Sequence, residues 1–356
     1  MANGADIEAH PKFPEQTSLE QAIEDNMIDI ARLLFENTSG FPHPRVLKMI
    51  QQAVEAGNHE TLRRLHKAGV DVGTPLNNAK TALHYACYYG DEAVVQYLVS
   101  AQVNIDAVDD GGETPLFVTT RVSTPGNNTV ANILVRAGAD VNVHCGANSS
   151  TPLIEATKQR CSAICHALLE NGARVDDSDQ YGRTALHHAA ELGSVSIATL
   201  LLRRGASVDA MDRFCRTALM EASSKGYTDL ARELLNTGAN PLLECIEGKT
   251  ALFLASWEGK VNALWLLLEA NTPINLVDND GYTPLHGACS QGHLHICRVL
   301  VGRRASLHVT DGLGRTPLHC ACFKGDCEIV QMLLRAGSPV RTYMSDQRND
   351  PPTHGL

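Results

Sequence analysis

The sequence predicts an all-α solenoid, in which helix–turn–helix units stack on one another. The first observation is a motif of threonine, then proline or alanine, then leucine. It recurs at intervals of 33 residues, as at Thr217, Thr250, Thr283 and Thr316. The second is that apolar residues follow each motif where a second helix would bury its face, as at Leu333 and Leu334. A chain with such a period grows by stacking units, so its 356 residues need not form two or three globular domains.

Each letter of the motif has a structural reason. Threonine caps the first helix, and proline at the next position loses no hydrogen bond there. A glycine such as Gly292 reverses the chain into the second helix, and another such as Gly337 ends that helix in a left-handed conformation. Three residues replace the helix-ending glycine, so we expect left-handed backbone at Gln102, Asn271 and Arg304.

The segment Tyr-Thr-Pro-Leu-His-Gly-Ala at 282–288 resembles the T-P-L-H-x-A signature of the ankyrin repeat. Eight copies span residues 76–340. The resemblance implies an ankyrin-repeat solenoid of about ten helix–turn–helix repeats with short projecting β-hairpins. It also implies that the motif histidines form hydrogen bonds between neighbouring repeats. These histidines are His84, His187, His286 and His319.

The repeat register divides the chain into three parts. Residues 1–16 are predicted to be a disordered N-terminus, residues 17–340 the ankyrin-repeat domain, and residues 341–356 a flexible C-terminal tail. Within the domain, the repeat heads fall at 17, 48, 81, 114, 151, 184, 217, 250, 283 and 316. The first two are divergent, as expected of a cap that faces water.

Composition restricts the partners. A net charge of −10 argues against a nucleic-acid binder, which needs a basic surface. The longest apolar runs are too short to cross a bilayer, so we expect no membrane insertion. Eleven cysteines lack paired spacing, and the polar N-terminal segment does not resemble a signal peptide. Both features predict reduced thiols in the cytoplasm or the nucleus.

Two patterns suggest other chemistry, but the repeat accounts for both. Several histidines and cysteines cluster late in the chain without a C-x-x-C pair, and most occupy small-residue or core positions of the repeat. They are Cys289, His293, His295, Cys297, Cys320, Cys322 and Cys327. Gly248-Lys249-Thr250 ends like a phosphate-binding loop, but Leu243 stands where that loop needs its first glycine. We therefore predict no metal, no cofactor and no catalytic residues.

The positions that the repeat leaves free are the candidates for binding. In ankyrin proteins, the hairpin tips and the outer side of the first helices line a concave groove that binds partners. Aromatic residues and arginine are enriched among the residues that dominate binding energy. The predicted partner-binding residues are Tyr88, Glu155, Tyr181, Arg183, Phe214, Arg216, Glu221, Lys249, Trp257, Tyr282 and Phe323.

The favoured function is a non-enzymatic scaffold or adaptor that holds a partner protein in this groove. One alternative is a substrate-recognition subunit of a cullin-type ubiquitin ligase, because ankyrin proteins with a SOCS box have that role. No such box is visible after Pro339, so this alternative requires a form that lacks it. A membrane–cytoskeleton scaffold would usually bring further domains. A metal-binding or enzymatic role is the weakest hypothesis.

Overall fold

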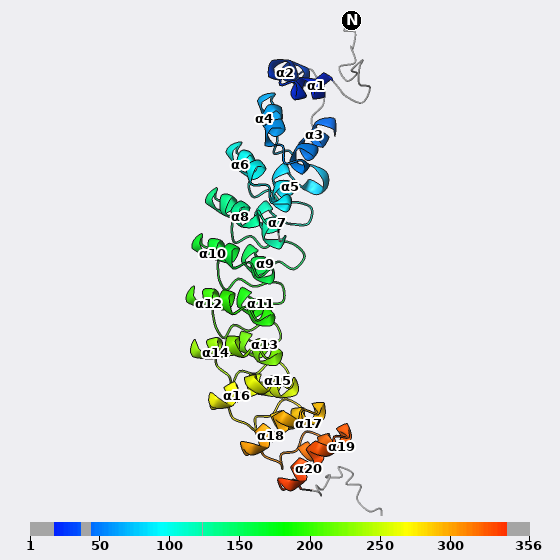
Figure 1. Ribbon diagram of the computed structural model, residues 1–356, viewed down its shortest axis with the longest axis vertical. Coiled ribbons are helices and arrows are strands. Elements are labelled where there is room, and N and C mark those ends of the chain that lie inside the picture. The colour runs from blue at the N-terminus through cyan, green and yellow to red at the C-terminus, as the bar shows by residue number, and fades with distance from the viewer. Residues whose placement is uncertain (1–17, 37–43, 123, 340–356) are drawn as a thin grey trace, which may run out of the picture. The chain divides into compact units, whose positions relative to one another are not determined.

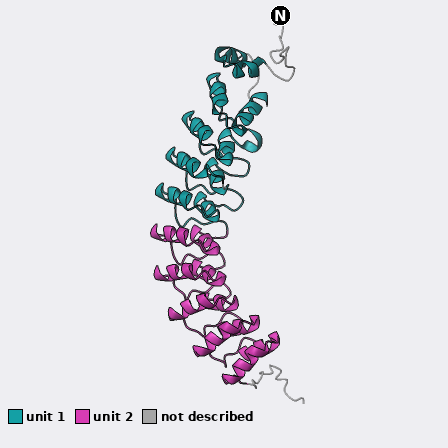
Figure 2. Cartoon of the chain, viewed as in Figure 1, with its two compact units in different colours: residues 1–180 teal, residues 181–356 magenta. Residues whose placement is uncertain are grey.

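The computed structural model describes residues 18–36, 44–122 and 124–339, which form twenty α-helices, one short 3-10 helix and no β-strand (Figure 1). The described chain divides at residues 180 and 181 into two compact units, which are treated separately below (Figure 2). The predicted all-α fold is confirmed. The segments expected to be a disordered N-terminus and a flexible tail, and the repeat head at 17, lie outside the described residues.

Unit 1 contains five consecutive helix pairs. In each pair the first helix packs on the second, and from α3 onward each first helix also contacts the next first helix. The 3-10 helix Asn77–Ala79 precedes the third pair. The pairs are α1 (Ser18–Glu24) with α2 (Ile28–Glu36), α3 (Pro44–Glu55) with α4 (His59–Lys67), α5 (Ala82–Tyr89) with α6 (Glu92–Ser100), α7 (Pro115–Arg121) with α8 (Asn127–Arg136), and α9 (Pro152–Lys158) with α10 (Ser162–Glu170).

The predicted head at 48 does not begin a helix. Lys48 lies inside α3, which begins at Pro44. Proline suits a first helical turn because its fixed φ is already helical and its missing N–H would have no partner there. The register of this divergent repeat is therefore set by Pro44.

Unit 2 also contains five helix pairs, and both its first and its second helices contact their counterparts in the next pair. The pairs are α11 (Ala185–Leu192) with α12 (Val195–Arg203), α13 (Ala218–Lys225) with α14 (Thr228–Asn236), α15 (Ala251–Trp257) with α16 (Val261–Glu269), α17 (Pro284–Gln291) with α18 (Leu294–Gly302), and α19 (Pro317–Lys324) with α20 (Cys327–Arg335). Leu285 and Ala288 of α17 are completely buried, because a small alanine lets neighbouring helices approach closely.

The motif threonines are the N-caps of their helices. Each has an extended backbone, at Thr81, Thr114, Thr151, Thr184, Thr217, Thr250, Thr283 and Thr316. In four of these helices, the histidine three residues on completes a capping box. The backbone N–H of Thr283, for example, donates to Nδ1 of His286 at 3.1 Å.

Three of the four motif histidines also connect repeats, as predicted. Since Nδ1 accepts from the threonine N–H, the ring carries its proton on Nε2, which donates to a carbonyl of the next turn. His286 Nε2 lies 3.0 Å from the Arg315 carbonyl oxygen, and His187 Nε2 lies 2.9 Å from that of Arg216. His84 makes the same bond to Glu113 at 3.0 Å. Burial lowers the pKa of these three imidazoles, which keeps them neutral.

The predicted hairpins are short turns. The backbone N–H of Asp311 donates to the Arg315 carbonyl at 2.9 Å, and the Asp311 carboxylate accepts the N–H groups of Leu313 and Arg315. Asp278 closes the turn to Tyr282 in the same way. One aspartate thus satisfies the turn internally, and in the described chain these turns are too short to form a strand.

The non-glycine residues expected in a left-handed conformation adopt it. The φ angle is +56° at Gln102, +58° at Asn271 and +63° at Arg304. The same position holds glycine in other repeats, as at Gly238 and Gly337 with φ of +96° and +90°. The backbone therefore follows the repeat even where the residue is unfavourable for it.

Candidate functional site

Nine of the eleven predicted partner-binding residues belong to unit 2. They lie on the surface made by its first helices, α11 to α19, and by the turns that precede them, which we call the first-helix face. Tyr181, Arg183, Phe214, Arg216, Lys249 and Tyr282 come from the turns, and Glu221, Trp257 and Phe323 from the helices. The other two, Tyr88 and Glu155, belong to unit 1.

The structure brings three of these residues together around one hollow of about 590 Å³. Trp257 at the end of α15, Tyr282 before α17 and Phe323 in α19 provide its aromatic surfaces. Phe323 is 92% exposed, so it contributes almost nothing to the folded core. The remaining lining residues are Ser290, Arg315, His319, Cys320 and Cys322.

Trp257 is held in place by two neighbours. Its ring stacks on that of Phe253, with ring centroids 6.0 Å apart and an angle of 18° between the planes. Gly287 of α17 lies close to both rings, since an added Cβ atom there would be 3.2 Å from the indole and 3.5 Å from the Phe253 ring. Trp257 is therefore half-buried and supports the hollow as well as lining it. Replacing it would cost stability, contrary to the expectation of a wholly exposed groove residue.

A cation lies against each of two aromatic rings that line the hollow, those of Trp257 and Tyr282. Lys249 Nζ is 5.5 Å from the centre of the Trp257 ring and also pairs with Glu247. The Arg315 guanidinium lies 5.6 Å from the Tyr282 ring and donates to its hydroxyl oxygen. Arg315 Nε also donates to Asp311 Oδ2 at 2.7 Å, and this bond raises the pKa of Arg315. Both cations are thus already engaged by acids of their own unit.

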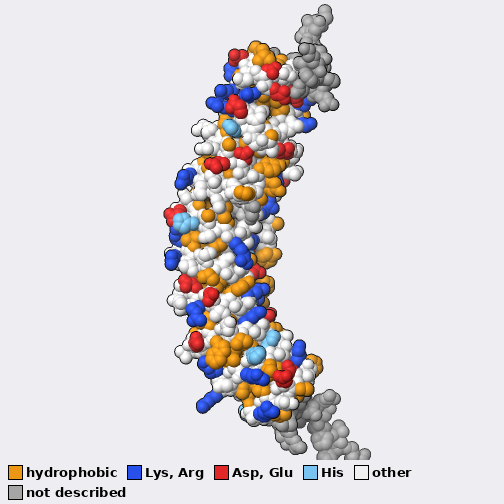
Figure 3. Space-filling model, viewed as in Figure 1, with side chains coloured by type: hydrophobic (Ala, Val, Ile, Leu, Met, Phe, Trp, Pro, Cys, Tyr) orange, Lys and Arg blue, Asp and Glu red, His pale blue; other side chains and the backbone are white. Residues whose placement is uncertain are grey.

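The other predicted basic residues are paired in the same way. Arg183 Nη1 donates to Glu191 at 2.9 Å, and Arg216 Nε lies 3.2 Å from Glu221. On the side of the molecule in Figure 3, acidic and basic side chains are interspersed among apolar ones over the described residues. The predicted row of arginine and lysine is therefore present but largely neutralised. This favours uncharged side chains over carboxylates as ligands of the hollow.

Tyr181 and Phe214 stand at the tips of neighbouring turns, with 47% and 51% of their surface exposed. The backbone joins these tips, because the N–H of Arg213 donates to the Tyr181 carbonyl at 2.9 Å and that of Ile246 to the Phe214 carbonyl at 3.0 Å. Neither aromatic residue lines the hollow. They form a second, more open part of the first-helix face.

In unit 1, Tyr88 is half exposed and its ring packs edge-on against Tyr89. Glu155 is buried in α9, where Lys158 Nζ donates to it at 2.7 Å. Since this carboxylate is satisfied within its own helix, Glu155 is better explained as part of the fold.

Sequence reasoning missed Arg315 and Ser290 as members of the site. Arg315 occupies the position before the motif threonine, as Arg183 and Arg216 do, and Ser290 occupies the position of Trp257 one repeat later. The repeat register was therefore a usable signal for both. The register does not reveal which of these positions meet at one hollow, because that depends on the side-chain conformations.

Three of the cysteines and histidines considered as metal ligands, Cys289, Cys297 and His293, have structural contacts. Cys289 Sγ and Cys297 Sγ lie 3.7 Å apart in the core, and His293 Nε2 lies 2.9 Å from the Trp257 carbonyl oxygen. Over the described residues, no three His, Cys, Asp or Glu side chains are grouped so that they could hold a metal ion. None of the helices that the structure describes combines the length and apolar composition required to cross a bilayer.

Comparisons with known proteins point to the repeat itself. The family model for ankyrin repeats in three copies matches residues 50–145, 121–212, 208–278 and 265–343, which is well over half of the chain. Similar proteins include the phosphocholine transferase AnkX of Legionella pneumophila, 29% identical over 138 residues, which are 38% of this chain and 14% of that protein. Human neurogenic locus notch homolog protein 1 is 32% identical over 122 residues, 33% of this chain and 4% of that protein.

A third relative is the mouse Arf-GAP with coiled-coil, ANK repeat and PH domain-containing protein 2. It is 31% identical over 143 residues, which are 37% of this chain and 18% of that protein. The chain thus spans less than a fifth of the length of each of these three relatives. What they share with it is the repeat. From the extent of the family match and the capped helix pairs, the chain belongs to the ankyrin-repeat family.

Proposed function

We propose that the protein is a non-enzymatic adaptor that binds a partner protein on the first-helix face of unit 2, with the hollow at Trp257, Tyr282 and Phe323 as its anchor site. Ankyrin repeats are generally protein–protein interaction modules, which supports the class of function. The main support for this site is Phe323, an aromatic residue that is 92% exposed and lines the hollow together with Trp257 and Tyr282. Exposing such a side chain to water is unfavourable unless a partner covers it.

The chemistry of the hollow indicates what it would accept. A volume of about 590 Å³ accommodates one or two large side chains, and most of its wall is aromatic or sulfur-containing. Because Arg315 and Lys249 are engaged by Asp311 and Glu247, an acidic anchor would have to compete with existing pairs. We therefore propose a peptide segment that inserts leucine, methionine or phenylalanine, with Ser290 available for a polar contact.

The proposed compartment is the cytoplasm or the nucleus. All eleven cysteines are free thiols in the described chain, as expected where glutathione keeps thiols reduced. The ubiquitin-ligase alternative rests on family resemblance alone, so no pathway is proposed.

The test begins with affinity purification on the intact chain, after which the captured protein is purified and its affinity measured by calorimetry. Phe323→Ala should weaken binding at least tenfold, about 1.4 kcal/mol, because contacts of this kind commonly dominate an interface. Its thermal stability should not change, since Phe323 is almost fully exposed. Trp257→Ala should weaken binding as well, but at a cost in stability.

The matched control is Leu242→Ala, since Leu242 is 47% exposed in unit 2 but does not line the hollow. It should leave the affinity unchanged. Binding that survives both Phe323→Ala and Trp257→Ala would exclude the hollow as the anchor site.

A further inference from the structure

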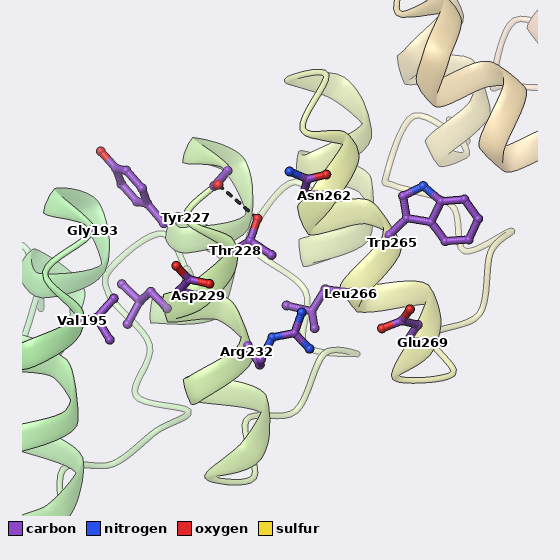
Figure 4. Close-up of a pocket in the computed structure, with 12 residues that line it drawn as sticks. Gly193, Val195, Tyr227, Thr228, Asp229, Arg232, Asn262, Trp265, Leu266 and Glu269 are labelled. Carbon is purple, nitrogen blue, oxygen red and sulfur yellow. Dashed lines mark hydrogen bonds between the residues drawn. The ribbon is translucent and has the colours of Figure 1, made fainter.

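A second hollow, of about 630 Å³, lies on the opposite side of the helix pairs of unit 2, among the second helices α12, α14 and α16 (Figure 4). We call this surface the second-helix face. Asp229 and Arg232 come from α14, and Trp265 and Glu269 from α16. Val195 of α12 and Tyr227, just before α14, also line it.

Its two aromatic residues occupy positions that are polar in the other repeats of unit 2. Residues at multiples of 33 from Tyr227 are Ser194, Lys260, His293 and Asp326. Residues at multiples of 33 from Trp265 are Thr199, Arg232, Arg298 and Gln331. Tyr227 and Trp265 are each 37% exposed, so burial in the core does not account for them. The repeat fold has no need of either ring at its position.

Both rings are fixed at the edges of the hollow. Tyr227 lies over Gly193, where an added Cβ atom would come within 2.8 Å of the ring. The Arg303 guanidinium lies 4.6 Å from the centre of the Trp265 ring. Aromatic side chains that are already ordered lose little conformational entropy on binding, which favours them as contact residues.

The charges around this hollow differ from those of the first-helix face. Asp229, Arg232, Glu269 and Arg303 are all exposed, and none forms an ion pair with another described residue. Two acids and two bases are thus unpaired within one small area. A uniformly acidic or basic partner would leave half of them unmatched, whereas a surface with the same mixed pattern could match all of them.

We infer that this surface binds a second copy of the chain, with α14 of one protomer over α16 of its partner. Residues 33 apart in adjacent helices lie at the same height along their helix axes. A two-fold axis that runs between α14 and α16, parallel to both, therefore places Arg232 opposite the partner's Trp265. Glu269 lies one helical turn beyond Trp265, within the same reach of an arginine side chain. Two-fold symmetry forms every contact twice, so the Arg232–Glu269 pair would form twice across the interface.

This inference does not depend on the proposed function. Trp265, Arg232 and Glu269 do not line the hollow at Trp257 and Phe323, so dimer formation and partner binding can succeed or fail separately.

The experiment is sedimentation equilibrium and light scattering of the intact chain over about a hundredfold range of concentration, because association depends on mass action. Near 0.15 M salt the Debye length is about 8 Å, which limits repulsion between chains of net charge −10. We expect a mass that rises toward twice 38.4 kDa. Trp265→Ala should raise the dissociation constant of the dimer at least tenfold.

Charge reversal tests the pairing directly. Arg232→Glu and Glu269→Arg should each weaken the dimer, since each places like charges together twice. The double variant should restore it, because the reversed residues face one another again. Both residues are exposed, so at concentrations where the chain is monomeric none of these variants should change the thermal melt. Arg298→Glu is the matched control, an exposed reversal at the Trp265 position of the next repeat, and it should leave the dimer unchanged.

A chain that stays at 38.4 kDa at every concentration would overturn the inference. A dimer that withstands Trp265→Ala and both single reversals would overturn it as well, by locating self-association elsewhere. Failure of the double variant to recover would exclude the Arg232–Glu269 pairing on which the inference rests.

Discussion

Arg304→Gly should stabilise the protein, although it removes a whole side chain. Arg304 ends α18 with φ of +63°, at a position where Gly238 and Gly337 stand in other repeats. A left-handed conformation costs a residue with a Cβ atom about 1–2 kcal/mol. Glycine avoids that cost but loses more chain entropy on folding, by about 0.5–1 kcal/mol. The net gain expected for Arg304→Gly is therefore about 0.5–1 kcal/mol.

The assay is urea unfolding followed by circular dichroism. With a slope near 2 kcal/mol per M, the gain corresponds to a rise of about 0.2–0.5 M in the midpoint. The slopes of variant and parent must agree, because repeat arrays can lose two-state behaviour. Arg304→Ala separates the two contributions, since it shortens the side chain but keeps the Cβ atom. Its midpoint should stay close to that of the parent.

Two further variants in unit 2 test the same backbone effect. Asn271→Gly should gain less than Arg304→Gly, because asparagine adopts left-handed backbone more readily than most residues. Gly238→Ala should lose about 0.5–1 kcal/mol, purely through the backbone, since an added Cβ atom there would meet nothing within 4 Å. If Arg304→Gly leaves the midpoint unchanged or lowers it while Gly238→Ala behaves as expected, the strain assigned to Arg304 does not exist.

Three other predictions concern buried polar groups and thiols. Asn127→Ala should lower the free energy of unfolding in urea by about 1–3 kcal/mol, because the buried Asn127 amide donates to the Thr119 carbonyl at 2.9 Å. The control Asn128→Ala changes an exposed residue and should cost far less. Equal costs would contradict this role of Asn127. The free energy of unfolding should fall as the pH drops below about 6.5. Burial lowers the pKa of His286, so in this range the unfolded chain binds more protons than the folded chain. Equal urea midpoints at about pH 7.5 and pH 5.5 would refute this. In the native protein a thiol reagent should label the exposed Cys322 and Cys327. Cys87, whose pKa is raised by burial to about 12, should react only when the protein unfolds. Labelled peptides are identified by mass spectrometry, and equal labelling of all three cysteines in the native protein would contradict this.

The backbone was the most predictable part of the molecule. The capping threonines, the inter-repeat bond of His286 and the left-handed Arg304 all follow from the repeat register, because each element must present the same geometry to its neighbour. The divergent repeat at Lys48 was predicted less well. There the motif is missing, and Pro44 decides where the helix begins.

The site was predictable only as a set of candidate positions. The register identified Trp257, Tyr282 and Phe323 separately, and the structure places them around one hollow. The register could not show that Arg183 pairs with Glu191 and Arg216 with Glu221. Such pairs depend on the conformations of side chains from neighbouring elements. For the same reason, the aromatic residues of the second-helix face were not recognised from the sequence.

The glycine next to Trp257 gives this scaffold a simple way to change what it recognises. A methyl group at Gly287 would lie 3.2 Å from the indole and 3.5 Å from the Phe253 ring, so a larger residue there must displace these rings and change the shape of the hollow. Gly287 itself is buried and lies outside the lining of the hollow. A single substitution beneath the surface could therefore redirect binding in evolution or in engineering while every residue that contacts the partner stays the same.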